Sequence, residues 1–381
     1  MRVMLVCPEP LGHRQPAGIG IRFLEMERVL RADGHGVTLL SRDDGAFVPE
    51  TLLRVSGASD VAVVQGHVAN DFFAHARPIP TVIDLYDPFI IENLHYFAER
   101  GGEVFAHDHA TLMTSLARGD FFLCASAAQR HFYLGALLAA GRVNPLAFES
   151  DPTLQSLIAI APFGVPPPRA SVHDAANVLF GGIYDWYDPI LAIEAVKLAR
   201  ERMPSMTLTF TTHPNPDLTP QGKTAEAMQY AKTLDFVKFE PWVAYEERGA
   251  FYDRFAAALL TFPQSIETDL SMRTRVYDYL WGGLPIVTSS APGTDEILTR
   301  YGAGTVVDSA SPGAFADALL DTLRDAERLR EGARRFVGDH QWPRVLQPLV
   351  DFVRAPRTDA QKELQQPSIL DRIKRRIGGR A

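Results

Sequence analysis

Short apolar runs alternate with helical segments along most of the chain, and this alternation restricts the fold more than any other feature. The first unit consists of a predicted strand at Val3–Val6, a loop rich in Pro and Gly, a helix over residues 21–32 and a second strand at Val37–Leu40. Strands that are apolar along their whole length are typical of parallel sheets covered by helices on both faces. The pattern therefore predicts an α/β fold with doubly wound, Rossmann-like parallel sheets.

A proline-rich stretch, Ala161–Pro168, interrupts the alternation, because its sequence suits neither a helix nor a central strand. The alternation restarts at residues 177–180 and continues to residues 304–307. The 381 residues also exceed the usual ~100–200 residues of one domain. We therefore expect Rossmann-like domains over residues 1–165 and 166–340, followed by a helical segment and basic tail over residues 341–381.

Composition limits the partners and the compartment. The formal charge of −8 disfavours broad nucleic-acid binding, which requires a surplus of Lys and Arg. Cys7 and Cys124 lie in apolar runs and are predicted to be buried free thiols of a reducing compartment. The apolar run at the N-terminus is too short for a signal peptide, and none approaches the ~18 apolar residues of a membrane span. We expect a cytoplasmic protein, at most peripheral to a membrane.

The last residues combine apolar and basic side chains. Ile369, Ile373 and Ile377 recur every four residues among Lys and Arg, so a helix here would be apolar on one side and basic on the other. Such a helix could touch an anionic membrane surface. A solvated, frayed tail or a helix docked on the first domain are the alternatives.

Ligands of doubly wound sheets bind beyond the carboxyl ends of the strands, so the loops there are the candidate binding sites. Gly18 and Gly20 precede a predicted helix, whose free N–H groups favour anionic or polar ligand oxygens. Gly181 and Gly182 end a predicted strand ahead of the helix that begins at Asp188-Pro189, where a phosphate could rest. In both places the glycines could instead serve only to make a turn.

The segment from Glu267 to Pro285 carries the most chemistry. Ser271 is predicted to cap a helix over residues 271–281, whose first turns carry Arg273 and Arg275. Cations at a helix start oppose the helix dipole, and a bound pyrophosphate would resolve that conflict. Asp278, one to two turns later, could accept hydrogen bonds from a ribose diol. The alternative is a solvated charged face in which the arginines pair with Glu267 and Asp269.

Asp84 and Asp87 follow another predicted strand and are candidates for acceptor binding or for a general base. A turn at Asp87-Pro88 would explain one of them structurally. His67 and His213 also end predicted strands, where a structural role is the more common one. The sequence contains no cluster with metal-ligand spacing and no Gly-x-Ser-x-Gly elbow, so neither a metal site nor a serine hydrolase is predicted.

Taken together, these motifs resemble the GT-B glycosyltransferases, in particular the family 4 group that uses sugar nucleotides. The resemblance covers nearly the whole chain. Its motifs are the Gly-Ile-Gly loop at residues 18–20, the Gly-His-x-Val-Thr element at 34–38, Phe-Gly-Val-Pro at 163–166 and above all residues 277–287. This last stretch is similar to the Glu-Ala-Met-Ala-x-Gly-x-Pro-Val motif of the family.

The resemblance implies two domains facing a cleft, with C-terminal helices packed back on the first domain. It also implies a nucleotide-diphosphate sugar as donor substrate, no cofactor, and retaining, metal-independent transfer of a hexosyl or deoxyhexosyl group. The acceptor would be a glycan or a lipid-linked glycan of cell-surface polysaccharide biosynthesis at the inner membrane face.

Individual residues inherit roles from the same resemblance. Asp278 would bind the ribose. Family members carry two glutamates with seven residues between them, whereas Glu267, the candidate for donor contact, lies eleven positions before Asp278, which indicates a divergent branch. No basic pair follows the first strands of the second domain, so Arg273 and Arg275 would replace it on the diphosphate, with Lys223 as a weaker candidate.

Several alternatives remain open at this level. In an inverting reaction, Asp84 or Asp87 would be the base. A sugar-nucleotide epimerase has the same architecture, and the unusual spacing of the acids also permits a non-catalytic GT-B partner subunit. A nicotinamide dehydrogenase is the least favoured class, because neither glycine loop has the full dinucleotide fingerprint.

Overall fold

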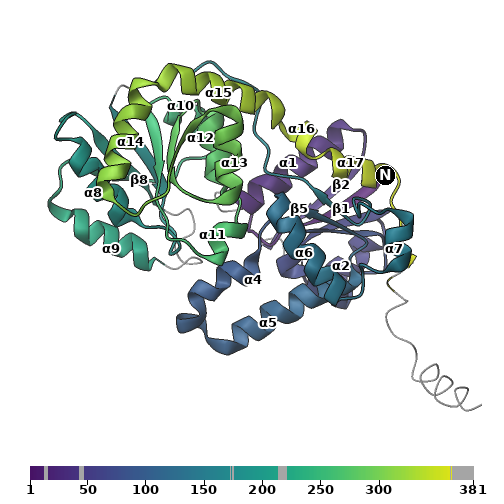
Figure 1. Cartoon of the computed structure of the whole chain (residues 1–381). Coiled ribbons are helices and arrows are strands. Elements are labelled where there is room, and N and C mark those ends of the chain that lie inside the picture. Colours follow the sequence, from purple (N-terminus) through teal and green to yellow (C-terminus); the bar gives the residue numbers. More distant parts are fainter. Residues whose placement is uncertain are drawn as a thin grey trace, which may run out of the picture.

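The computed structural model describes residues 1–12, 16–42, 47–171, 173, 176–212, 221–360 and 362, with backbone only for residues 97–100. Within these residues the chain forms two six-stranded sheets with helices on both faces (Figure 1). All strand pairs in both sheets are parallel. The α/β class with two doubly wound sheets, predicted from the alternation of apolar runs and helices, is confirmed.

The first half of the chain builds the first sheet. Its elements are β1 (Arg2–Val6), α1 (Gly18–Ala32), β2 (Gly36–Leu40), α2 (Pro49–Ser56), β3 (Val61–Gln65), α3 (Ala69–His75), β4 (Thr81–Asp84), α4 (Phe89–Glu92), α5 (Phe97–Arg118), β5 (Phe121–Cys124), α6 (Ala127–Ala139), α7 (Pro145–Ser150) and β6 (Ile158–Ile160). The strand order is β2-β1-β3-β4-β5-β6.

The second half repeats the plan with a second sheet. Its elements are β7 (Asn177–Gly182), α8 (Pro189–Ala199), β8 (Thr207–Thr211), α9 (Gly222–Tyr230), β9 (Val237–Glu240), α10 (Arg248–Tyr252), β10 (Ala257–Leu260), α11 (Ile266–Leu270), α12 (Thr274–Trp281), β11 (Ile286–Ser289), α13 (Pro292–Tyr301), β12 (Gly304–Val307), α14 (Pro312–Arg324) and α15 (Ala326–Asp339). The strand order is β12-β11-β10-β7-β8-β9.

Each sheet has one point where the strand order reverses, and these points position the site. In the first sheet β1 lies between β2 and β3, and in the second β7 lies between β8 and β10. At a reversal point, the loops after two adjacent strands run to opposite faces of the sheet, and a crevice opens between these loops at the carboxyl edge. The crevice is therefore expected at the loops after β1 and β3 and at those after β7 and β10.

The chain crosses between the halves twice, and the two crossings pack together. Val165 pairs with Gln341 in an isolated parallel bridge, and the ring of Phe163 meets that of Trp342 at 4.6 Å. Gly164 permits this approach, because a Cβ there would lie 2.4 Å from the Trp342 ring. The proline-rich stretch thus crosses between the halves with Ala161, Phe163 and Val165 buried and with Pro167 and Pro168 exposed. The predicted domain limits at residues 165 and 340 remain predictions.

The C-terminal helices α16 (Trp342–Val345) and α17 (Gln347–Arg354) return to the first half, beside α1 in Figure 1. Arg354 forms an ion pair with Asp33, and the rings of Phe352 and Phe121 stack at 4.9 Å. This return was implied by the family resemblance. No helix in the described part of the chain combines the length and apolar character needed to cross a membrane.

Candidate active site

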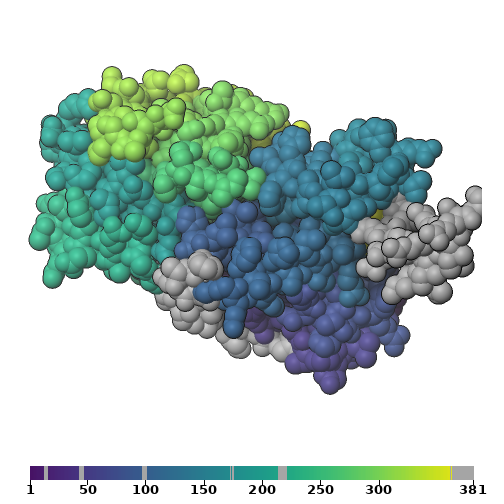
Figure 2. Space-filling view, turned by 60° about the horizontal axis from the view of Figure 1, so that its bottom comes forward, coloured from purple at the N-terminus to yellow at the C-terminus, as the bar shows by residue number. Residues whose placement is uncertain are grey.

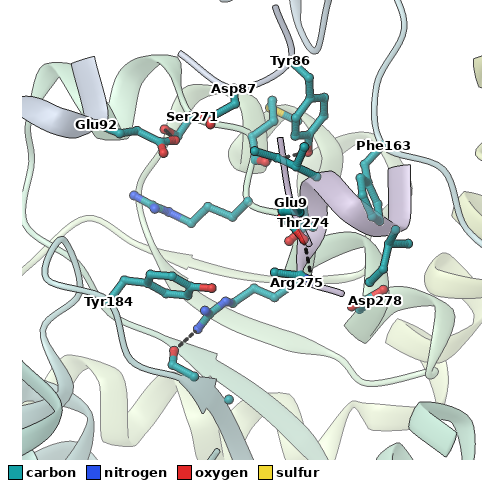
Figure 3. Close-up of a pocket in the computed structure, with 18 of the residues that line it drawn as sticks. Glu9, Tyr86, Asp87, Glu92, Phe163, Tyr184, Ser271, Thr274, Arg275 and Asp278 are labelled. Carbon is teal, nitrogen blue, oxygen red and sulfur yellow. Dashed lines mark hydrogen bonds between the residues drawn. The ribbon is translucent and has the colours of Figure 1, made fainter. Parts of the chain in front are cut away.

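A cavity of about 450 Å³ lies between the two halves. It is lined by the loops after β1 and β4 on one side and by those after β7, β9 and β10 on the other (Figure 3). Glu92 of helix α4 also lines it, and in Figure 2 the blue surface of α4 and α5 lies against the teal and green second half. The cavity thus lies at the carboxyl edges of both sheets and includes the expected loops after β1, β7 and β10, whereas the loop after β4 takes the place expected for the loop after β3.

Arg275 brings a positive charge to the end of β7. It lies in the first turn of α12, and its guanidinium donates a 2.6 Å hydrogen bond to the carbonyl of Gly182. The same group stands over the ring of Tyr187 at 4.3 Å, and it lies beside Tyr184 in Figure 3. Arg275, Gly181 and Gly182, predicted from separate motifs, therefore line one region of the cavity.

Arg273 also borders the cavity but is already paired. Its guanidinium donates hydrogen bonds of 3.1 and 2.9 Å to the two carboxylate oxygens of Glu267, with both side chains almost fully buried. It stacks over Phe262 at 4.3 Å. The alternative weighed from sequence, a pairing of this arginine with Glu267, is the arrangement present, although the pair is buried rather than solvated. A direct phosphate contact by Arg273 would require this pair to break.

The predicted helix cap at Ser271 is wrong. Ser265 caps α11 instead, accepting a hydrogen bond from the Thr268 N–H, and α12 begins only at Thr274. The predicted helix over residues 271–281 therefore starts three residues later than expected, and an extended link joins it to a separate short helix, α11, that the sequence did not predict. Ser271 lies in that link, and its hydroxyl donates a 3.1 Å hydrogen bond to Glu92 of the first half.

Asp278 is held by a partner that sequence reasoning missed. Arg248, in α10, donates a 2.7 Å hydrogen bond to one carboxylate oxygen, and both residues line the cavity. The Arg248 guanidinium also stands over the ring of Trp242 at 5.0 Å. Arg248 lies 30 positions before Asp278, so no local motif links them. The pair sits at the cavity wall where a ribose was predicted.

Gly18 and Gly20 lie in the first turn of α1, where a carboxylate already binds several backbone N–H groups. The carboxylate of Glu9 accepts a 2.9 Å hydrogen bond from the Ala17 N–H, and it also accepts from the N–H groups of Ile19 and Gly20. Burial raises the pKa of Glu9 despite these bonds. A Cβ on Gly20 would lie 2.5 Å from the carboxylate, and one on Gly18 would lie 3.0 Å from Thr274. Gly18 and Gly20 therefore permit close packing against Thr274 and Glu9, and Gly18 also lines the cavity, so their predicted role in ligand binding remains a prediction.

Asp84 is not available as a base. Arg22 donates hydrogen bonds of 2.8 and 3.0 Å to its two oxygens, both side chains are about 1% exposed, and Asp84 is not among the residues that line the cavity. The same guanidinium donates to the carbonyls of Ala161 and Pro162 in the first crossing. Because Asp84 ends β4 pointing into the core, it holds the crossing in place, and its predicted catalytic role is corrected.

Asp87 lines the cavity together with Glu92, a residue that the sequence did not single out. The two carboxyl groups share a hydrogen bond, and burial raises the pKa of both. In Figure 3 they lie close to Ser271. Within Phe-Ile-Ile-Glu at residues 89–92, Glu92 resembles an ordinary residue of an amphipathic helix, so only the tertiary structure identifies this carboxyl pair.

The remaining residues considered from the sequence either lie away from the cavity or fall outside the residues that the structure describes. His67 is largely buried against the Phe89 ring, and burial lowers its pKa. Lys223 forms an ion pair with Glu226 on the surface. His213 and the basic tail lie outside the described residues. Cys7 and Cys124 are free and buried, and no set of three His, Cys, Asp or Glu side chains in the described part could hold a metal.

Comparison with known proteins agrees with this architecture. Residues 177–325, which form nearly all of the second sheet and its helices, match the family model described as Glycosyl transferases group 1. No curated protein sequence matches the chain. The chain has two parallel, doubly wound sheets that face a cavity, and the half that contains the second sheet matches this family model. This arrangement defines the GT-B class of proteins.

Solved structures support the same class. WaaG, a glycosyltransferase involved in lipopolysaccharide biosynthesis, is 14% identical with a TM-score of 0.66, and the match covers 93% of this chain and 100% of WaaG. HepE from Anabaena, in complex with UDP and glucose, is 12% identical with a TM-score of 0.64, covering 93% and 99%. Pneumococcal GtfA is 13% identical with a TM-score of 0.52, covering 77% of this chain but only 56% of GtfA.

At such identities the likeness shows the fold, and the match to the family model adds the group. Residues 177–325 match the model of the group 1 glycosyl transferases, and the chain as a whole has the GT-B fold. The resemblance inferred from the motifs at residues 18–20, 34–38, 163–166 and 277–287 is thereby confirmed.

Proposed function

We propose that this chain transfers a sugar from a nucleotide-diphosphate sugar to an acceptor hydroxyl. The observation that carries the proposal is the placement of Arg275 over the carbonyl of Gly182, at the reversal point of the second sheet, with Asp278 one turn further along the same helix. A cation and a carboxylate so spaced suit a diphosphate and the ribose attached to it. HepE and GtfA, which share this fold, were solved with UDP bound.

Each group has a specific task in this reaction. The free oxygen of Asp278 accepts hydrogen bonds from the ribose hydroxyls, while Arg248 orients the carboxylate and opposes the rise in its pKa that burial causes. Arg275 stabilises the negative charge that develops on the diphosphate as the bond to the sugar C1 breaks. Such electrostatic stabilisation of the transition state is usually the largest single contribution to catalysis. The aromatic wall of Tyr184, Trp186 and Tyr187 excludes water from the sugar.

The finer proposal follows the resemblance. We propose retaining, metal-independent transfer of a hexosyl or deoxyhexosyl group to a glycan or lipid-linked acceptor in polysaccharide biosynthesis, at the cytoplasmic membrane face. WaaG, a lipopolysaccharide enzyme, supports this acceptor class by its likeness in fold. In retaining transfer the leaving diphosphate takes the proton of the acceptor hydroxyl, so no protein base is needed.

The carboxyl pair of Asp87 and Glu92 favours a second candidate, inverting transfer. A pair that shares one proton retains one negative charge and can accept a second proton. In that reaction the acceptor oxygen attacks C1 from the face opposite the diphosphate, and its proton passes to the pair. NMR of the anomeric proton of the first-formed product separates the two outcomes.

A thermal-shift panel of nucleotides and sugar nucleotides tests the proposal, because a ligand that binds the folded state raises the melting temperature. We expect one nucleoside diphosphate and its sugar conjugates to raise it, and the same conjugate to support transfer in the presence of EDTA. Epimerised donor without acceptor would indicate an epimerase instead. If no nucleotide raises the melting temperature, a non-catalytic GT-B subunit replaces the proposal.

A further inference from the structure

Three consecutive residues of the second half are each hydrogen bonded to the first half. The carbonyl of Leu270 accepts from the Gln129 side-chain amide at 2.9 Å, and the carbonyl of Met272 accepts from the Tyr86 hydroxyl at 2.8 Å. Between them lies Ser271, whose hydroxyl donates to Glu92 at 3.1 Å. Leu270 ends α11, and Ser271 and Met272 begin the extended link to α12; the three residues are called the latch below.

The first half holds its side of the latch rigidly. Gln129 is fully buried, and its side-chain oxygen accepts from the Ala125 N–H at 2.7 Å while its amide also donates to the Tyr86 carbonyl at 3.0 Å. The Tyr86 ring lies under the guanidinium of Arg22 at 4.7 Å. Because Arg22 is itself fixed by Asp84 and by the carbonyls of the crossing, the Tyr86 hydroxyl has little freedom to move.

The second half places the latch between its donor-binding groups. Glu267 precedes the link, and the Arg273–Glu267 ion pair closes it into a compact loop. Arg275 follows it by three residues, at the Gly182 carbonyl. Any shift of the link would therefore displace Arg275 and the start of the helix that carries Asp278.

We propose that Tyr86 and Gln129 are positioning residues that set the donor-binding loop of the opposite half through this latch. The inference rests on the proposed function, because the loop is positioned for the diphosphate of the sugar nucleotide. The latch forms only when both halves face each other across the cavity. The latch therefore links the closing of the two halves over the cavity to the placement of Arg275. As a result, the bond between the sugar and the diphosphate is weakened only when the closed cavity admits the acceptor and excludes water.

Hydrogen–deuterium exchange of the full chain tests the latch independently of any activity. The principal variant is Tyr86→Phe, which removes one hydroxyl and keeps the ring under Arg22. Tyr230→Phe is the matched control, since its hydroxyl makes a 2.7 Å hydrogen bond to Glu194 on the surface of the second half. We expect the peptide covering residues 266–276 to exchange roughly 2- to 10-fold faster in Tyr86→Phe, as the loss of one hydrogen bond allows, and to be unchanged in the control.

The double variant Tyr86→Phe/Ser271→Ala should accelerate exchange further, and it avoids replacing Gln129, which the Ala125 N–H also needs. In a transfer assay, the same variants should lose roughly 2- to 10-fold in kcat and release more free sugar per sugar transferred. The thermal shift caused by uridine diphosphate, the probe for donor binding, should persist.

Unchanged exchange over residues 266–276 in both variants overturns the latch. Faster exchange with an unchanged ratio of hydrolysis to transfer overturns its positioning role. A wild-type chain that transfers no sugar from any donor instead refutes the proposed function, and the exchange experiment still decides whether the latch exists.

Discussion

The guanidinium of Arg273 faces the carboxylate of Glu267 through two hydrogen bonds, with the side chains 3% and 1% exposed. Arg275, two residues later, instead donates to backbone carbonyls at the end of β7 and lines the cavity. Two arginines that look equivalent in the sequence therefore have different roles. Arg273 stabilises the loop, and Arg275 carries a charge that a ligand can use.

Arg275→Ala is expected to lower transfer by at least about 100-fold, the size of loss when a charge partner of the transition state is removed. The melting temperature should stay close to that of the wild type, because the guanidinium is hydrogen bonded to two backbone carbonyls and forms none of the buried ion pairs described above. Steady-state kinetics and thermal unfolding of the same preparation check this. Transfer at the wild-type rate by a folded Arg275→Ala variant would remove the phosphate assignment.

Arg273→Ala is expected to act first on stability. It leaves Glu267 charged, buried and without its partner, a change that typically costs about 3–5 kcal/mol of unfolding free energy. Urea unfolding measures the loss, and the double variant Arg273→Met/Glu267→Leu should recover most of it. A single variant as stable as the wild type, with transfer abolished, would return Arg273 to the predicted role in phosphate binding.

The two glycines at the end of β7 should respond differently to alanine. Gly181 has a φ of +84° and a Cβ there would lie 2.2 Å from the Tyr279 hydroxyl, whereas a Cβ on Gly182 would meet nothing closer than 3.6 Å. Gly181→Ala should therefore destabilise the chain by about 1–3 kcal/mol. Gly182→Ala should leave stability within about 0.5 kcal/mol while weakening nucleotide binding in the thermal-shift assay. Equal melting temperatures of the two variants would contradict this reading.

The carboxyl pair predicts a specific pH dependence of stability. Burial raises the pKa of Glu92 in the folded protein above its ordinary value in the unfolded chain. At a pH between these two pKa values, Glu92 is protonated in the folded protein and ionised in the unfolded chain. Stability attributable to Glu92 therefore falls as pH rises above about 4.3. Glu92→Gln should melt at a higher temperature than the wild type at pH 8, with the gap closing toward pH 4.5. A gap independent of pH would indicate that Glu92 is ionised in the folded state.

A strap formed by residues 356–360 should stabilise the first half. Arg142 has no exposed side-chain surface and donates a 2.6 Å hydrogen bond to Asp359, whose own N–H donates to Asp120. Asp359→Ala should lower the unfolding free energy by about 2 kcal/mol, less than for a fully buried pair because Asp359 is 20% exposed.

Asp351→Ala is the control for this prediction. Asp351 is 60% exposed and lies 3.7 Å from Arg354, so its removal should change the unfolding free energy by less than about 0.5 kcal/mol. Equal effects of the two variants in urea unfolding would show that the strap contributes nothing to stability.

The sequence by itself determined the α/β class, because hydrophobic periodicity is a local property. Runs such as Val61–Gln65 are buried on both faces, which only a covered parallel sheet provides. The motif at residues 277–287 likewise indicated the resemblance to the GT-B glycosyltransferases, because the helix, its Gly-Gly turn and the following strand are contiguous in the sequence.

Tertiary structure alone decided which polar residues reach the cavity. Arg22 and Asp84 are separated by 62 positions, so nothing local shows that one neutralises the other and withdraws it from catalysis. Glu9 similarly accepts from N–H groups at the start of α1, and Arg248 meets Asp278 across 30 positions. Whether a charged side chain is free or paired depends on which strands become neighbours, and that is set by packing of the whole chain rather than by local sequence.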